Sequence, residues 1–90
     1  MGALEAAPLD ADARRLQWRC RRGLKELDEL LERYVTATLP GASEQERGTL
    51  ARLLELPDPE LAGYLLGGSL PEDPQLAQLV EHILALSGNP

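Results

Sequence analysis

Residues 16–31, LQWRCRRGLKELDELL, decide the fold, because they contain the junction between two predicted helices. The junction is Gly23, since a glycine inside a helix costs ~1 kcal/mol relative to alanine. Two interpretations stay open: a bend between helices, or a gap that lets the backbone of another protein approach. If the helix continued through Gly23, Arg22 and Glu26 would lie four residues apart and form an ordinary surface ion pair.

Helices are predicted on both sides of this glycine. Asp10 or Asp12 can cap a first helix over residues 10–22. A second helix is predicted over residues 24–38, because its apolar side chains recur with a period of 3.6 residues on one face. The Leu-Pro-Gly sequence at residues 39–41 ends it.

Three more helices begin with capping signals. Ser43 and Glu46 form a capping box that starts a third helix, ending near residue 55. Residues 58–59 and 73–74 are both Asp-Pro, with the aspartate as N-cap and the proline at the first helical position. The fifth helix is expected to bury one apolar face, made of Leu76, Leu79, Val80, Ile83 and Leu84.

Composition also favours helices. Hydrophobic residues make up 43% of the 90 residues, with no Phe, one Trp and two Tyr, and leucine and alanine are better helix formers than strand formers. We therefore predict an all-α fold, a compact five-helix bundle in a single domain over residues 10–87. Residues 1–9 are expected to form a flexible N-terminal tail, and residues 88–90 a C-terminal tail.

Few side chains could carry chemistry, and a chain of this length buries only one small core. The single cysteine, Cys20, rules out an internal disulfide and a cysteine-based zinc cage, and it predicts a reducing, cytoplasmic setting. Cys20 shares a helix face with Ala13 and Leu16, which predicts a small buried thiol. His82 is the only histidine, and we expect it at the rim of the fifth helix without a specific role. We predict no catalytic residues, no metal site and no enzymatic activity.

Location and assembly follow from the apolar pattern. No apolar run reaches 18 residues, so no membrane span is predicted. The first ten residues hold two acids and no base, which argues against a secretory signal or a transit peptide. No long apolar heptad remains after the core is built, and a monomer is therefore expected.

Charge is unevenly distributed along the chain. The net charge is −6, which disfavours generic nucleic-acid binding. Residues 1–25 nevertheless carry six bases and three acids, whereas residues 26–90 carry three bases and twelve acids. The basic end is either a set of solvated helix faces or a docking patch for an acidic partner.

Trp18 lies within this basic end. On a helical wheel it points away from the core face, on the solvent side that it shares with Arg14, Arg21 and Arg22. Trp and Arg are common anchors of protein interfaces, so this composition indicates a binding surface. The alternative is that a neighbouring helix covers Trp18 while arginine stems pack over it. From the residues alone, the chain is an all-α interaction module with an unknown partner.

Two blocks of sequence carry recognisable motifs. Residues 18–28 match the pattern W-x-C-R-R-G-x-x-E-L-D, which contains the signature R-G-x-x-E at residues 22–26, and residues 52–61 match R-L-L-E-x-x-D-P-x-L. Together these blocks resemble the SdhE family of flavinylation factors. The resemblance implies a five-helix assembly chaperone that binds the flavoprotein subunit of succinate dehydrogenase and fumarate reductase. It also implies that the chaperone promotes covalent attachment of FAD to a histidine of that subunit. The FAD belongs to the partner, and this chain is expected to bind no cofactor stably.

The same resemblance implies which residues meet the flavoprotein. An exposed Arg22 and Gly23, together with Glu26, form the centre of the implied surface, and the residues beside them are Trp18, Arg19 and Asp28. Two departures from the family pattern matter little: Lys25 fills a variable position of the signature, and residues 39–41 are a local variant of a loop. We hypothesise that Arg22 pairs with carboxylates or carbonyls of the partner. Glu26 would then hold the orientation of Arg22 or accept from the partner.

Two other classes of function are open. A nucleic-acid-binding module would stack bases on Trp18 and place arginines on phosphates, namely Arg14, Arg15, Arg19, Arg21 and Arg22. The net charge and the acidic second helix argue against it. A regulatory module, such as the antitoxin of a toxin pair, would bind a protein other than a flavoprotein.

Overall fold

The computed structural model describes residues 10–86, so the tails predicted over 1–9 and 88–90 lie outside the described residues. In order along the chain, its elements are α1 (Ala11–Arg19), α2 (Lys25–Thr38), the 3-10 turn η2 (Leu39–Gly41), α3 (Glu44–Leu54), α4 (Asp58–Leu65) and α5 (Pro74–Leu86). Residues 10–86 contain these helices and no strand, which confirms the prediction of an all-α, five-helix fold. Within the same range, no helix is long and apolar enough to cross a membrane.

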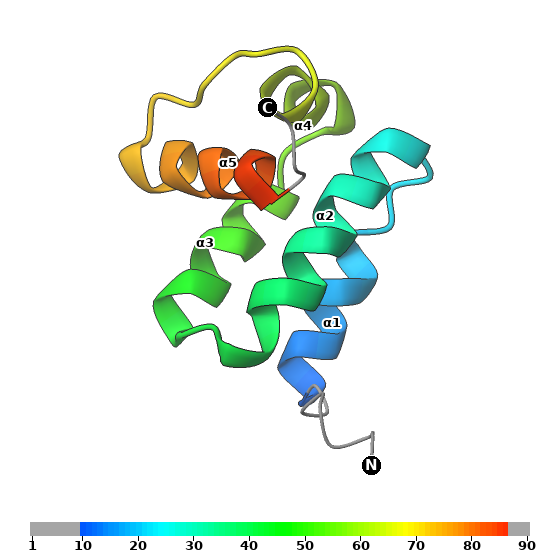
Figure 1. The fold of residues 1–90 in the computed structure, drawn as a ribbon, viewed down its shortest axis with the longest axis vertical. Coiled ribbons are helices and arrows are strands. Elements are labelled where there is room, and N and C mark those ends of the chain that lie inside the picture. The colour runs from blue at the N-terminus through cyan, green and yellow to red at the C-terminus, as the bar shows by residue number, and fades with distance from the viewer. Residues whose placement is uncertain (1–9, 87–90) are drawn as a thin grey trace.

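The first three helices alternate in direction. In Figure 1, α1 and α3 run away from the N-terminal end of the molecule, and α2 returns in the opposite direction. Helix α3 packs against α1, while α5 packs against both α2 and α3, and α4 contacts α2 and α5. The C-terminal ends of α1 and α3 therefore lie at the same end of the bundle, close to the start of α4 (Figure 1). This arrangement positions the candidate site.

The core is built from leucines on facing helices. Helix α2 buries Leu27, Leu31, Tyr34 and Val35, the face that its periodicity predicted. Helix α5 buries Leu79, Val80 and Ile83, while Leu76 and Leu84 are partly buried against the same core. The other buried members are Ala13, Leu16, Cys20, Leu39, Leu50, Leu53, Leu54, Leu61 and Leu65.

Two of the predicted caps for the later helices are present. The Ser43 hydroxyl accepts from the Glu46 N–H, and the Glu46 carboxylate accepts from the Ser43 N–H, which completes the capping box. Asp73 accepts from the N–H groups of Gln75 and Leu76 at the start of α5. Local sequence is sufficient for these caps, because every partner lies within three residues.

The predicted cap of the fourth helix is wrong. Pro57 is the N-cap of α4, and Asp58 is its first helical residue rather than the residue before it. The physical reason is a distant partner, because the Asp58 carboxylate accepts a hydrogen bond from Arg22 Nε at 2.8 Å. A carboxylate at this position still interacts favourably with the positive end of the helix dipole.

The predicted end of the first helix is also wrong. Helix α1 stops at Arg19, and Cys20 is its C-cap, with an N–H that donates to the Gln17 carbonyl, while the Arg21 N–H donates to the Trp18 carbonyl. Gly23 has a φ of +83°, a left-handed conformation that ordinary side chains rarely adopt. Gly23 therefore marks a bend between two helices, and the alternative of one continuous helix with an Arg22–Glu26 pair is excluded.

Candidate partner-binding site

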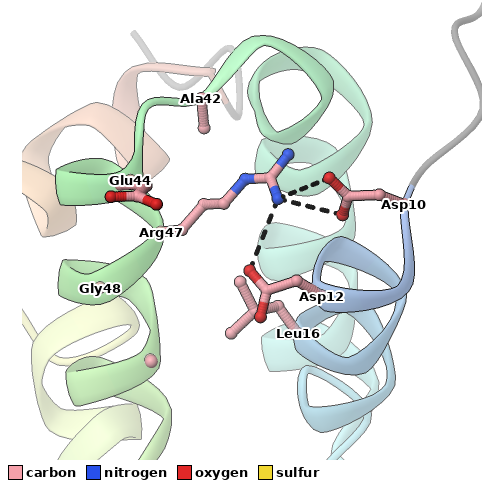
Figure 2. A pocket seen from close by; sticks show the side chains of 8 residues that line it. Asp10, Asp12, Leu16, Ala42, Glu44, Arg47 and Gly48 are labelled. Carbon is pink, nitrogen blue, oxygen red and sulfur yellow. Dashed lines mark hydrogen bonds and ion pairs between the residues drawn. The ribbon is translucent and has the colours of Figure 1, made fainter.

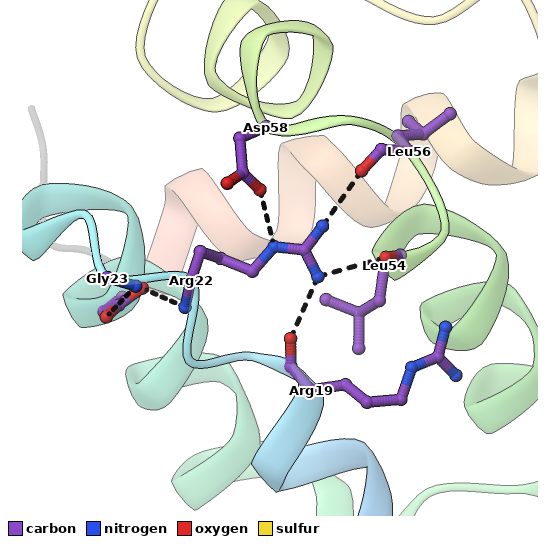
Figure 3. Close-up of polar contacts among 7 residues, drawn as sticks. Arg19, Arg22, Gly23, Leu54, Leu56 and Asp58 are labelled. Carbon is purple, nitrogen blue, oxygen red and sulfur yellow. Dashed lines mark hydrogen bonds and ion pairs between the residues drawn. The ribbon is translucent and has the colours of Figure 1, made fainter.

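Arg22 occupies the junction between the ends of α1 and α3 and the start of α4 (Figure 3). Its Nε donates to Asp58 at 2.8 Å, and its Nη2 donates to the Leu56 carbonyl at 2.9 Å. Its Nη1 donates to the carbonyls of Arg19 and Leu54, both at 3.0 Å. Arg19 and Leu54 are the last residues of α1 and α3, so this guanidinium satisfies carbonyls that the helices leave without an internal partner.

The prediction that the Arg22 side chain is exposed is therefore wrong. Only 15% of the side chain is accessible, and its four hydrogen bonds point into the protein. Its orientation is set by Asp58 and three backbone carbonyls, whereas Glu26 lies exposed in the first turn of α2. A helical wheel missed this because Arg22 lies beyond the last residue of α1, where the wheel no longer applies.

Asp28 holds the same loop from the side of α2. Its Oδ1 accepts from the Arg22 N–H at 2.9 Å, and its Oδ2 accepts from the Gly23 N–H at 3.2 Å. Asp28 is half-buried, and its own N–H donates to the Leu24 carbonyl at 2.8 Å. Residues 20–24, which we call the junction loop, are thus held by a carboxylate on one side and by the Arg22 side chain on the other.

Trp18 lies at the surface beside this loop in the sequence. It is 68% exposed, and the Cζ atom of Arg21 lies 5.3 Å from the centroid of its ring. The alternative in which a neighbouring helix covers Trp18 is therefore wrong. Within the protein, the ring makes a cation–π contact with Arg21. An exposed tryptophan of this kind is available to a partner.

The remaining predicted residues are also accessible. Arg19, Gly23 and Glu26 are exposed, and so is Leu24 at 43%. A Cβ atom built on Gly23 would meet nothing within 4 Å, so the space in front of this glycine is open. The six predicted site residues thus divide into an exposed set (Trp18, Arg19, Gly23, Glu26) and a supporting pair (Arg22, Asp28).

Sequence reasoning missed two further features. Asp58 was interpreted as a helix cap, although it is the ion-pair partner of Arg22. The signal available in the sequence was that Asp58 belongs to the second sequence block, as Arg22 belongs to the first. Leu66, which follows α4, is 47% exposed and was not singled out. Leu66 also lines a shallow groove of about 380 Å³ whose rim includes Glu26.

Cys20 is buried, as predicted. Only 4% of it is exposed, and burial raises the pKa of the thiol to about 12. The nearby Arg22 lowers this pKa, but the effect of burial is larger. The thiol is therefore protonated at neutral pH, which does not suit a nucleophile or a redox centre.

His82 has a packing contact that the sequence did not predict. Its ring lies edge-on to the ring of Tyr34, with centroids 5.4 Å apart and planes at 87°. Tyr34 is buried, and burial raises the pKa of its hydroxyl. Among residues 10–86, no group of three or more histidine, cysteine, aspartate or glutamate side chains could hold a metal ion.

A second arginine joins α1 and α3 at the opposite end of these helices (Figure 2). Arg47 Nη1 donates to both carboxylate oxygens of Asp10 at 3.0 Å and to Asp12 at 3.5 Å. The pKa of Asp10 is lowered, first by the N–H of Ala13 and then by Arg47. These contacts line an open pocket of about 730 Å³ between α1 and α3, and they hold the start of α1 in place.

Comparisons with known proteins agree with the sequence blocks. Residues 14–87 match the model of the Sdh5 family, described as the flavinator of succinate dehydrogenase. The FAD assembly factor SdhE of Methylococcus capsulatus is 46% identical over 74 residues, which cover 82% of this chain and 89% of the relative. The FAD assembly factor SdhE of Xylella fastidiosa is 41% identical over 76 residues, covering 84% and 78%. That of Idiomarina loihiensis is 38% identical over 74 residues, covering 82% of each chain.

The matched range contains both ends of the Arg22 network, since Arg22 and Asp58 lie within residues 14–87. It also contains the exposed residues Trp18, Gly23 and Glu26 beside the junction loop. The chain therefore belongs to the family of Sdh5 flavinators and SdhE FAD assembly factors.

Proposed function

We propose that this protein is an assembly factor that binds the flavoprotein subunit of succinate dehydrogenase and promotes covalent attachment of FAD to that subunit. Family membership over residues 14–87 is the observation that carries the proposal. The relatives are named FAD assembly factors, and their names describe a helper of another protein. The FAD belongs to the flavoprotein in this proposal, and the same surface serves fumarate reductase as a second client.

The exposed set of site residues is the surface that contacts the flavoprotein. Trp18 supplies a large accessible ring, which is the kind of side chain that anchors protein interfaces. Gly23 lets a backbone approach, because the space in front of it is open. Arg19 and Glu26 are exposed charged groups on either side of the junction loop in the sequence, able to pair with polar groups of the partner.

Arg22 and Asp28 belong to the same site through their support of the loop. Their hydrogen bonds hold residues 20–24 in one conformation before the partner arrives. A surface that is ordered in advance loses less conformational freedom on binding, which improves affinity. The contacts of Arg22 within the chain support a positioning role more than direct pairing with the partner.

The assembly factor acts on the flavoprotein by preferential binding. The flavoprotein supplies the acceptor histidine and the flavin, so this chain contributes by binding one conformation of the flavoprotein better than others. The population of the reactive arrangement then rises by as much as the difference in affinity allows. This role requires no catalytic group on the assembly factor.

We also propose that the protein works as a monomer in the cytoplasm. Cys20 is a free buried thiol, as is usual in a reducing compartment. The alternatives of a nucleic-acid-binding module and an antitoxin have weaker support. The Arg22 guanidinium, one of the arginines that would have bound phosphates, is occupied within the protein.

The test is covalent flavin on the apo-flavoprotein subunit of succinate dehydrogenase, read by fluorescence of the denatured protein. The subunit is incubated with FAD alone, with the wild-type assembly factor, or with Gly23→Leu. Gly68→Leu is the matched control, because Gly68 is also exposed, has a φ of +86° and faces open space. Both variants place a leucine at a left-handed φ and so strain the backbone, and only Gly23→Leu fills the proposed surface.

We expect the wild type and Gly68→Leu to stimulate flavinylation and Gly23→Leu to lose the stimulation. No stimulation by the wild type would overturn the proposed function. Equal losses in both glycine variants would show that backbone strain, rather than the surface at Gly23, is responsible.

A further inference from the structure

Asp58 lies 36 residues from Arg22 in the chain, yet its carboxylate accepts from Arg22 Nε at 2.8 Å. The Asp58 side chain is 42% exposed, and it lies at the first position of α4. It does not cap α4, whose N-cap is Pro57. The geometry of Asp58 is therefore accounted for by its contact with Arg22 and not by the start of the helix.

The bond to Asp58 fixes the plane of the guanidinium. With Nε held by Asp58, Nη2 faces the Leu56 carbonyl and Nη1 faces the carbonyls of Leu54 and Arg19 (Figure 3). Asp58 also supplies the negative charge that the mostly buried Arg22 needs, since carbonyl dipoles alone compensate a desolvated cation poorly. Removing the carboxylate weakens every other contact of the guanidinium.

The same arginine determines the shape of the junction loop. Its backbone N–H and that of Gly23 donate to Asp28, while its side chain reaches the end of α3 and the start of α4. A displaced Arg22 side chain would therefore shift Gly23, the residue with the open space in front of it.

We infer that Asp58 is a positioning residue for the flavoprotein-binding surface: it holds Arg22, and Arg22 holds the junction loop in its binding conformation. The inference rests on the proposed function. It joins the two sequence blocks, residues 18–28 and residues 52–61, into one structural unit, because each supplies one side of the ion pair. Asp58 acts through Arg22 and does not itself touch the partner.

The test measures flavinylation as a function of assembly-factor concentration for Asp58→Ala and Asp58→Asn. Asp73→Ala is the matched control, because Asp73 also pairs with an arginine, Arg52 at 2.6 Å, and caps α5 away from the junction loop. All variants are first compared by thermal unfolding, so that a loss of stability is measured separately from a loss of binding.

Asp58→Ala is expected to raise the half-saturating concentration ~10-fold and to leave the rate at saturation near that of the wild type, since one charge-assisted hydrogen bond is lost. Asp58→Asn keeps an oxygen acceptor, and its half-saturating concentration should rise by only ~2–4-fold. The half-saturating concentration of Asp73→Ala should stay at the wild-type value, even where its unfolding temperature falls.

A second measurement does not depend on flavinylation. The N–H groups of Arg22 and Gly23 should exchange with deuterium faster in Asp58→Ala than in the wild type and in Asp73→Ala. If the wild type fails to stimulate flavinylation, the proposed function falls, and the exchange rates still decide whether Asp58 positions the loop.

Three results would overturn the inference. The first is wild-type half-saturation and wild-type exchange in Asp58→Ala. The second is an equal rise in the half-saturating concentration for Asp58→Ala and Asp73→Ala. The third is a lower rate at saturation with unchanged half-saturation, which would give Asp58 a direct role in the reacting complex.

Discussion

Nη1 of Arg22 and the carbonyl oxygen of Leu54 lie 3.0 Å apart, although 32 residues separate them in the chain. This contact places a cation at the end of α3, where the helix dipole is negative and the last carbonyls lack helical partners. The same nitrogen donates to the last carbonyl of α1. One side chain therefore caps the C-terminal ends of two helices and connects them to α4.

Arg22→Lys should destabilise the protein although it conserves the charge. A lysine ammonium is a point donor and cannot reproduce four hydrogen bonds in the plane of a guanidinium. We expect the free energy of unfolding in urea to fall by about 1–3 kcal/mol. Arg52→Lys is the control, because Arg52 is 46% exposed. The free energy of unfolding of this variant should fall by less than ~0.5 kcal/mol. Equal losses in the two variants would contradict the role assigned to the Arg22 guanidinium.

Trp18→Ala should weaken binding of the flavoprotein without unfolding the assembly factor. The ring is 68% exposed, so its removal leaves no cavity in the core. A tryptophan anchor contributes about 2 kcal/mol or more to an interface, which corresponds to a dissociation constant raised ~30-fold. Calorimetric titration against the flavoprotein subunit measures this change. Leu70→Ala, at a residue that is 53% exposed, should bind like the wild type; a similar loss there would indicate that the interface lies elsewhere.

Leu31→Ala should have the opposite effect, a loss of stability that originates in the core. Leu31 is fully buried on the face of α2 that packs against the core. Truncating such a leucine costs about 2–5 kcal/mol, a large part of the stability of a small domain. Thermal unfolding followed by circular dichroism measures it. A change in unfolding temperature no larger than that of Leu70→Ala would argue against the described core.

The thiol of Cys20 should resist alkylation in the folded protein. Burial raises its pKa to about 12, so at pH 8 almost no thiolate is present. Iodoacetamide at pH 8 should label the protein only after urea is added, and mass spectrometry detects the label. Rapid labelling of the native protein would show that the thiol is accessible.

The same shift predicts how stability depends on pH. The pKa of the thiol is about 12 in the folded state, above its ordinary value of 9.0, so the unfolded chain loses this proton first as pH rises. The free energy of unfolding should therefore fall between pH 9 and pH 12, and remain unaffected by this group below pH 9. The free energy of unfolding of Cys20→Ala should fall less steeply with pH over the same range. Identical slopes for the variant and the wild type would assign the loss of stability to other groups.

Local sequence was sufficient for most of the fold. The second helix was predicted from its periodicity, and α3 and α5 were predicted from their caps, because the partners of each cap lie within three residues. The bend at Gly23 was one of two interpretations, and a φ of +83° confirms it; the other, a gap for the backbone of a partner, is compatible with the bend and stays a prediction. The resemblance of residues 18–28 to a family supplied the candidate site residues, and their contact with a partner stays a prediction.

Tertiary structure alone decided how the site is built. The resemblance to a family implied that Gly23 and Glu26 are exposed, and the helical wheel left open whether a neighbouring helix covers Trp18. Sequence reasoning placed Arg22 among the exposed residues and made Asp58 a cap, because both inferences used only neighbours along the chain. The pairing of Arg22 with Asp58 requires that α1, α3 and α4 end or begin at one place, which only the packing of the helices brings about. A charged side chain chooses its partner by distance in space, and sequence separation does not reveal that distance.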